Sequence, residues 1–193
     1  RRGGKGIKAM STRDEDYVDT LFTASTHDYI MFFTNFGRVY KKKGYMIPEA
    51  GRTAKGTNIV NIIPLQEGES VSSMIRMTSL EEAMASEDRY LVLVTRNGTV
   101  KRMEMSALKN IRTGGIRAIT LDEDDELISV LDTDGSKLVL IATHNGMAIC
   151  FDEKDIRTMG RTAAGVRGIK LKEGDYCVGA GIADTDKTVL AVT

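Results

Sequence analysis

The sequence predicts an all-β fold, arranged as a propeller-like ring of four-stranded blades, and two recurring patterns lead to this prediction. Apolar runs ending in threonine recur at Tyr29–Thr34, Tyr90–Thr95, Leu138–Thr143 and Thr188–Thr193. Their closing threonines lie 61, 48 and 50 residues apart. A glycine followed by a short strand-like run recurs at Gly6, Gly56, Gly115 and Gly165, at intervals of 50, 59 and 50 residues. Both patterns indicate a repeat of about 50 residues, and no long helical period accompanies them.

One repeat shows which strands and turns the unit contains. Its predicted strands are, in order, Glu126–Leu131, Leu138–Thr143, Met147–Phe151 and Val166–Leu171. Asp132-Thr133-Asp134-Gly135 and Lys172-Glu173-Gly174-Asp175 predict turns between them. His144-Asn145-Gly146 predicts a tight hairpin of type I′, because Asn-Gly tolerates the positive φ angles of that turn.

Four short antiparallel strands in each repeat are typical of a propeller blade. Runs such as Leu138–Thr143 are apolar without alternation, which predicts strands buried on both faces. A β-solenoid is the weaker alternative, because hairpin turns at both ends of the strands fit it poorly. We expect residues 1–193 to form a single domain that begins and ends within a blade, hence a partial ring. An insert at about residues 78–88 explains the one long interval.

Charge is balanced overall but unevenly distributed. The chain has 27 Lys+Arg and 27 Asp+Glu, yet residues 1–60 hold 11 basic and 6 acidic side chains. Hydrophobic residues make up 41% of the chain, as in ordinary globular proteins. No apolar run reaches the length of a membrane span, and no signal-like segment follows the first residues, so we expect a cytoplasmic protein without a membrane partner. We expect Cys150 and Cys177 to be reduced structural thiols.

Aligning the repeats on their glycines brings one basic loop into register four times. The copies are residues 1–6 (RRGGKG), 51–56 (GRTAKG), 110–115 (NIRTGG) and 160–165 (GRTAAG). Each copy carries an arginine, and two also carry a lysine: Arg2 with Lys5, Arg52 with Lys55, Arg112, and Arg161. Because the copies occupy the same place in successive blades, these side chains should line one rim. Cations beside small residues suit a phosphate backbone, which also accepts hydrogen bonds from backbone N–H groups.

Further basic residues complete the candidate DNA-binding set. They follow the second-strand turns, at Arg38, Lys41, Lys42 and Lys43 in one repeat and at Lys101 and Arg102 in the next, or the loop glycines, at Arg117 and Arg167. The third repeat reads Met147–Phe151 after its turn and lacks such cations, so the basic band should thin along the chain.

The first loop, Arg1-Arg2-Gly3-Gly4-Lys5-Gly6, resembles the signature box of the C-terminal domain of the DNA gyrase A subunit. In that family a glutamine normally precedes the box, and this chain begins at Arg1. The resemblance extends over the whole chain through the repeats. It implies a β-pinwheel with a basic rim around which duplex DNA wraps, in a bacterial cytoplasmic type IIA topoisomerase that introduces negative supercoils.

The resemblance also has implications for catalysis, cofactors and partners. The catalytic tyrosine and the ATPase belong to other parts of that enzyme, so the chain is expected to be a non-catalytic wrapping module. No cofactor is expected in it, and ATP and Mg²⁺ are used elsewhere in the enzyme. The implied partners are double-stranded DNA, the remainder of the gyrase A subunit, and the gyrase B subunit.

Two alternatives remain open beside this interpretation. The related domain of topoisomerase IV has a degenerate or lost box, so the intact box favours gyrase. A propeller that serves as a protein-interaction scaffold would need no basic row, and the absence of Trp counts against it. No catalytic or metal-binding motif is recognised: His27 and His144 fit turns, and the acidic run at residues 122–126 fits an exposed turn.

Overall fold

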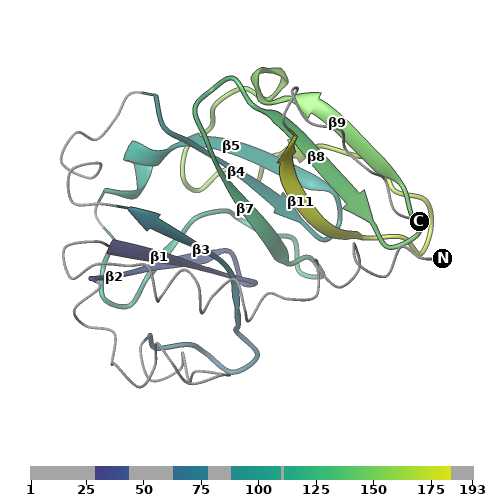
Figure 1. Cartoon of the computed structure of the whole chain (residues 1–193). Coiled ribbons are helices and arrows are strands. Elements are labelled where there is room, and N and C mark those ends of the chain that lie inside the picture. The colour runs from purple at the N-terminus through teal and green to yellow at the C-terminus, as the bar shows by residue number, and fades with distance from the viewer. Residues whose placement is uncertain (1–28, 44–62, 78–87, 110, 184–193) are drawn as a thin grey trace, which may run out of the picture.

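The computed structural model describes residues 29–43, 63–77, 88–109 and 111–183. Within them, short strands dominate and the helices are 3-10 turns (Figure 1). The strands are β1 (Tyr29–Thr34), β2 (Arg38–Lys43), β3 (Val71–Met77), β4 (Tyr90–Thr95), β5 (Thr99–Glu104), β6 (Ile116–Arg117), β7 (Leu127–Thr133), β8 (Leu138–Thr143), β9 (Ala148–Asp152), β10 (Val166–Arg167) and β11 (Cys177–Ala183). The 3-10 turns are η3 (Met105–Leu108) and η4 (Glu153–Asp155). None of the helices in these ranges is long and apolar enough to cross a membrane.

The strands form three antiparallel sheets, so the all-β prediction is confirmed. Blade 1 has the strand order β3-β1-β2-β6, blade 2 the order β10-β5-β4-β7, and blade 3 the order β11-β8-β9. The threonine-ended runs are the equivalent strands β1, β4 and β8, with the bounds that the repeat predicts. The predicted run at Thr188–Thr193, the glycines Gly6 and Gly56 and nearly all of the insert lie outside the described residues.

The pairing of the strands differs from the sequence prediction. The four strands of one sequence repeat, β7 to β10, do not form one blade. β8 and β9 form the hairpin of blade 3, whereas β7 and β10 flank the β4–β5 hairpin of blade 2. In the same way β6, which follows the blade 2 hairpin, pairs with β2 of blade 1. After each new hairpin the chain thus returns to the preceding blade and supplies its outermost strand.

The hairpin turns also differ from the predicted type I′. The N–H of Gly146 donates to the carbonyl of Thr143 (3.1 Å), and the N–H of Thr143 donates to the carbonyl of Met147 (2.8 Å). This is a three-residue loop that ends on a left-handed glycine, the other common hairpin connection. The Thr143 hydroxyl also accepts a hydrogen bond from the N–H of Met147 (3.1 Å), as the Thr95 hydroxyl does from Thr99. The recurrent threonine is therefore part of the turn.

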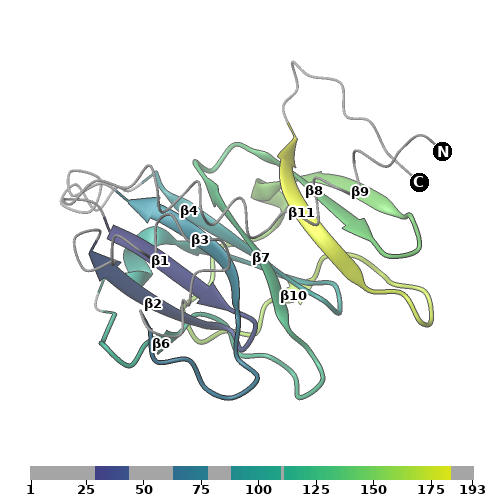
Figure 2. The ribbon, with the colours of Figure 1, turned by 60° about the horizontal axis from the view of Figure 1, so that its bottom comes forward.

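Two hydrophobic cores of the described residues lie between neighbouring blades. Alternate residues of β4 point to opposite sides, so Leu91 and Leu93 join the core shared with blade 1 while Val92 and Val94 join the core shared with blade 3. This explains the apolar run without alternation. Strands β3, β7 and β11 pack along the inner edge. Strands β6 and β10 are consequently the outer end strands of their sheets, opposite β3 and β7; Figure 2 labels all four.

The segment just after β10 lies close to the β4–β5 turn, and this close approach can be tested at Gly98. Its φ is +89°, and an added Cβ would lie 2.9 Å from the carbonyl oxygen of Ile169, just after β10. Gly174 has a similar φ of +81° with nothing within 4 Å of an added Cβ. We expect Gly174→Ala to cost about 1–2 kcal/mol, the strain of a left-handed alanine. Gly98→Ala should cost about 2 kcal/mol more, because the clash adds to that strain.

Urea unfolding of the two variants measures this difference directly. Equal losses of unfolding free energy would mean that the segment after β10 does not press on the blade 2 turn.

Candidate nucleic-acid interface

The outer edge carries the two basic loops that the structure describes. The loop at residues 111–115 leads into β6, and the loop at residues 160–165 leads into β10; we call these two segments the rim loops. Gly115 and Gly165 hold equivalent places at their ends, since β6 pairs with the start of β2 and β10 with the start of β5. The glycine alignment is therefore confirmed for these two copies.

Three arginines of this edge are exposed: Arg112, Arg117 and Arg167. Arg117 and Arg167 are each the second residue of an outermost strand, so they repeat at the same position in consecutive blades. Arg161 is half-buried, and its Nη1 donates to the backbone carbonyl of Arg117 (2.9 Å). The arginines of the two repeats therefore lie along one continuous edge.

The second rim loop lies directly against the segment that follows β6. The Thr120 hydroxyl donates to the carbonyl of Thr162 (2.6 Å), and the Thr120 N–H donates to the carbonyl of Ala163 (3.4 Å). Beneath them, the Lys101 ammonium donates to the carbonyls of Ala118 (2.7 Å) and Arg161. We call this contact between residues 117–120 and 161–163, with Lys101 below it, the rim junction.

Two predicted DNA-binding residues are buried instead of surface-exposed. Lys101 is 0% exposed and Arg102 is 8% exposed. They are consecutive in β5, so their side chains point to opposite faces: Lys101 toward the blade 1 side and Arg102 toward blade 3. Neither side chain lies where a phosphate could reach it, and the prediction that they contact DNA is corrected accordingly.

Arg102 belongs to a buried ion pair that joins blades 2 and 3. Its Nε lies 3.2 Å from Oε1 of Glu153, its Nη1 donates to the carbonyl of Ile156 (3.2 Å), and its guanidinium stacks on Tyr90. Glu153 is fully buried and also accepts hydrogen bonds from the Thr133 hydroxyl and the backbone N–H of residue 137. Because every charge has partners, the pair can be tolerated in the interior.

Arg38 also supports a rim loop. Its Nη2 donates to the carbonyls of Gly114 (2.8 Å) and Gly115 (3.1 Å), so it fixes the loop that presents Arg112. On the same strand Lys41 and Lys42 are half-buried and Lys43 is exposed. Lys41 and Lys43 lie over the ring of Tyr29, at 4.6 and 5.4 Å from its centroid.

The structure adds two exposed cations that the sequence analysis did not single out. Lys109 follows η3 and Arg157 follows the residue after η4, so each precedes a rim loop at an equivalent place. The signal in the sequence is a cation directly after an apolar residue that ends or follows the short turn, Leu108 or Ile156. The box residues Arg1, Arg2, Gly3, Gly4, Lys5 and Gly6, together with Arg52 and Lys55, lie outside the described residues.

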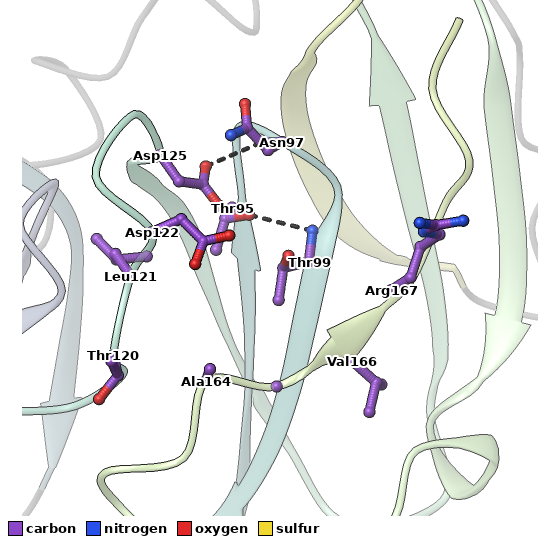
Figure 3. Close-up of a pocket in the computed structure, with 11 residues that line it drawn as sticks. Thr95, Asn97, Thr99, Thr120, Leu121, Asp122, Asp125, Ala164, Val166 and Arg167 are labelled. Carbon is purple, nitrogen blue, oxygen red and sulfur yellow. Dashed lines mark hydrogen bonds between the residues drawn. The ribbon is translucent and has the colours of Figure 1, made fainter.

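Acidic residues bound this edge on one side. The acidic run forms a turn, in which the N–H of Asp125 donates to the carbonyl of Asp122 (3.0 Å), as the sequence predicts. A groove of about 340 Å³ separates this turn from the second rim loop and β10 (Figure 3). Asp122 and Asp125 lie on one wall and Arg167 on the other. A polyanion placed on the arginine side would thus be repelled from the turn side.

Comparison with protein families matches most of the chain to one family. The model described as DNA gyrase C-terminal domain, beta-propeller, matches residues 1–25, 28–76, 89–134 and 137–184. The chain is 50% identical over 194 residues to the DNA gyrase A subunit of Staphylococcus epidermidis, and 47% identical over 194 residues to that of Staphylococcus aureus. These alignments cover 100% of the chain but 21% of each relative, so the chain spans about a fifth of the length of these proteins.

Two solved structures share the fold. The C-terminal domain of DNA topoisomerase IV matches with a TM-score of 0.73 and 34% identity, over 83% of this chain and 48% of that chain. A DNA gyrase A C-terminal domain matches with a TM-score of 0.65 and 28% identity, over 82% of this chain and 49% of that chain. Both agree with the propeller-like arrangement of the blades.

The buried ammonium at the rim junction predicts a pH dependence of stability. Burial, with a smaller contribution from the charge of Arg161, lowers the pKa of Lys101 from 10.5 to about 8. Between these values the unfolded chain binds more protons than the folded chain, so the free energy of unfolding should rise with pH, by up to about 1.4 kcal/mol per unit. Urea unfolding of the wild type between pH 8 and 9 should show this rise, and Lys101→Met should lack it.

Cys177 has the opposite effect at higher pH. Its burial, together with the charges of Asp175 and Asp125, raises the pKa of its thiol from 9.0 to about 11, so its contribution to stability falls above pH 9. Because Cys177 titrates in both proteins, the difference between the wild type and Lys101→Met isolates Lys101 between pH 8 and 9. Parallel curves for the wild type and Lys101→Met in this window would contradict the prediction.

Proposed function

Since this chain belongs to the family of DNA gyrase C-terminal domains, we propose that it binds duplex DNA along its outer edge and bends it without reading the base sequence. The observation that carries this proposal is the repetition of exposed arginines at equivalent places of consecutive blades, Arg117 on β6 and Arg167 on β10. A repeated cation at blade spacing suits a repeated anion, and the phosphates of duplex DNA provide one.

The chemistry of the edge favours phosphate contacts. Arg112, Arg117 and Arg167 are exposed, and Lys109, Arg157 and Lys43 are further exposed cations. The described residues contain no helix long enough to lie in a major groove, where base edges are read. Contacts to phosphates position DNA but carry no sequence information, so binding should be nearly independent of sequence.

Bending follows from the rigid spacing of the rim loops. Smoothly bending 20–30 bp of DNA by 40–90° costs of the order of 1–6 kcal/mol. Arginines on consecutive blades can offset this cost through contacts that only a bent duplex makes simultaneously. We extend the row by repetition to the box, Arg1–Gly6, and to Arg52 and Lys55, so that the whole chain forms one DNA-binding domain.

Within the whole enzyme, we propose that the bent DNA serves ATP-dependent negative supercoiling by a bacterial cytoplasmic gyrase. In this proposal the chain itself is non-catalytic and works with the remainder of gyrase A, together with the gyrase B subunit. The similarity to the C-terminal domain of topoisomerase IV, with 34% identity, supports that enzyme as a second candidate. The six-residue box and the identity to gyrase A subunits support gyrase.

Direct contact of the repeated arginines with phosphates can be tested by single substitutions. Arg117→Ala and Arg167→Ala should each weaken binding to a 40-bp duplex by about fivefold and reduce the slope of log K against log salt by about 1, whatever the sequence. Fluorescence anisotropy over a salt series measures both quantities. Lys137→Ala is the matched control, because Lys137 is an exposed lysine in the connection that leaves the inner strand β7.

For the wild type, neutralising about 6–10 phosphates would lower affinity by roughly 10³–10⁵ between 50 and 200 mM salt. Binding that is insensitive to salt, or that a scrambled sequence of the same length abolishes, would rule out the proposed function.

The role of the box can be tested in the intact enzyme. Replacing Arg1, Arg2 and Lys5 by Ala should abolish supercoiling while ATP-independent relaxation survives, because the strand-passage machinery lies elsewhere in the enzyme under this proposal. Binding of the isolated chain to linear DNA should weaken only modestly, since the other rim loops remain. Agarose gel assays with negatively supercoiled and relaxed plasmids distinguish the two activities. Loss of both would indicate a structural role for the box.

A further inference from the structure

We propose that Lys101 is a positioning residue that fixes the second rim loop against the segment after β6 and thereby sets the curvature of the DNA path. The inference rests on the proposed DNA binding and adds a role for a cation that no phosphate can reach. Lys101 is fully buried beneath the rim junction, and its ammonium donates to one carbonyl on each side of it, Ala118 and Arg161.

An ammonium suits this place for a geometric reason. Two backbone carbonyls from different repeats point at the same buried spot, and a lysine offers three donors on one atom. An apolar side chain would leave both carbonyls without this partner, which is costly in the interior. Arg161, whose carbonyl accepts a hydrogen bond from Lys101, also spans the rim junction, because its side chain donates to the carbonyl of Arg117.

The other two blades do not have this bridge at the same strand position. In the second strand of each hairpin, the equivalent position is the second residue that pairs with the first strand. This position is Tyr40 in blade 1, Lys101 in blade 2 and Ile149 in blade 3. The Tyr40 hydroxyl donates to Glu69 (3.0 Å), within its own blade, and an isoleucine offers no donor. Lys101 therefore distinguishes the rim junction from the corresponding places in the described residues of blades 1 and 3.

The consequence concerns the exposed arginines on either side. Arg117 lies in the segment that Lys101 holds through Ala118. Arg167 pairs with Thr99 on β5, the strand that carries Lys101, and follows the rim loop that Lys101 holds through Arg161. Loss of the bridge should let the two arginines move relative to one another without altering either one. A duplex that contacts both should lose affinity and bend less, whereas a duplex that contacts one should not.

The experiment compares Lys101→Met with the wild-type chain on two duplexes. One has about 15 bp, or one and a half helical turns, and the other about 40 bp with a fluorophore at each end. We expect Lys101→Met to bind the long duplex about tenfold more weakly and to bring its ends together less, as measured by energy transfer. On the short duplex, affinity should stay within twofold and the salt slope should not change, since no phosphate contact is removed.

Thr120→Val and Lys137→Met complete the design. Thr120 is exposed, and its substitution removes only the hydroxyl bond to Thr162, so this variant should fold and lose about twofold to threefold on the long duplex alone. Lys137→Met removes an exposed lysine charge away from the junction and should behave as wild type on both duplexes. If Lys101→Met does not fold by circular dichroism, Thr120→Val decides the matter.

The outcomes separate this inference from the proposed function. Wild-type chain that neither binds nor bends the long duplex would overturn the proposed function itself. If Lys101→Met bends the long duplex as strongly as the wild type does, the inference alone is overturned. If Lys101→Met does not fold, the inference is overturned when Thr120→Val binds and bends the long duplex as the wild type does. An equal loss on short and long duplexes, with a smaller salt slope, would mean that Lys101 contacts DNA directly, and this too overturns a positioning role.

Discussion

Blades 1 and 2 each receive their outermost strand from the repeat that follows in the chain, and the rest of this structure depends on this constraint. β6 and β10 are only two residues long, yet each joins a blade that the chain has already left. Every such strand brings a rim loop with it, so the loop of one repeat is fixed to the hairpin of the preceding one. Consecutive blades are thus linked by the covalent chain, by backbone pairing and by the shared cores on both faces of β4. Interfaces tied in these three ways resist changes of angle, and a surface laid across them keeps its curvature.

The same constraint decides which cations face solvent. Along β5 the side chains alternate between the two neighbouring blades, and both neighbours are close enough to bury them. Lys101 meets the rim junction on one side, and Arg102 meets Glu153 on the other. Cations on the short outer strands have no blade beyond them among the described residues, and Arg117 and Arg167 are accordingly exposed. Basic residues therefore serve two purposes in this fold: some join the blades, and others remain available for an anion.

The sequence predicts the strands of this fold better than their partners. The threonine-ended runs predict β1, β4 and β8 with their observed bounds, because a buried strand and a turn-capping threonine are local properties. Pairing between β10 and β5 spans more than sixty residues and leaves no local signal. The predicted strand Val166–Leu171 is shorter than expected for a related reason: the N–H groups of Gly168 and Ile169 both turn to the carbonyl of Gly98 and end the ladder. Lys101 and Arg102 are buried by contacts with segments far away in the chain. Their position after a hairpin turn gives no sign of those contacts.

The distribution of charge on the folded chain adds a direction to the proposed path of DNA. Net charge is zero, but the turn at residues 122–125 is acidic and lies across a groove from Arg167. A duplex that moved over this turn would bring its phosphates toward Asp122 and Asp125 and would lose contact with the outer strands. Attraction of phosphates by the outer-strand arginines and their repulsion by the adjacent acidic turn together restrict the duplex to a narrow path along this edge. A stiff duplex that follows such a line must adopt the angle between the blades, so the rigidity of the blade junctions and the placement of charge act on the DNA together.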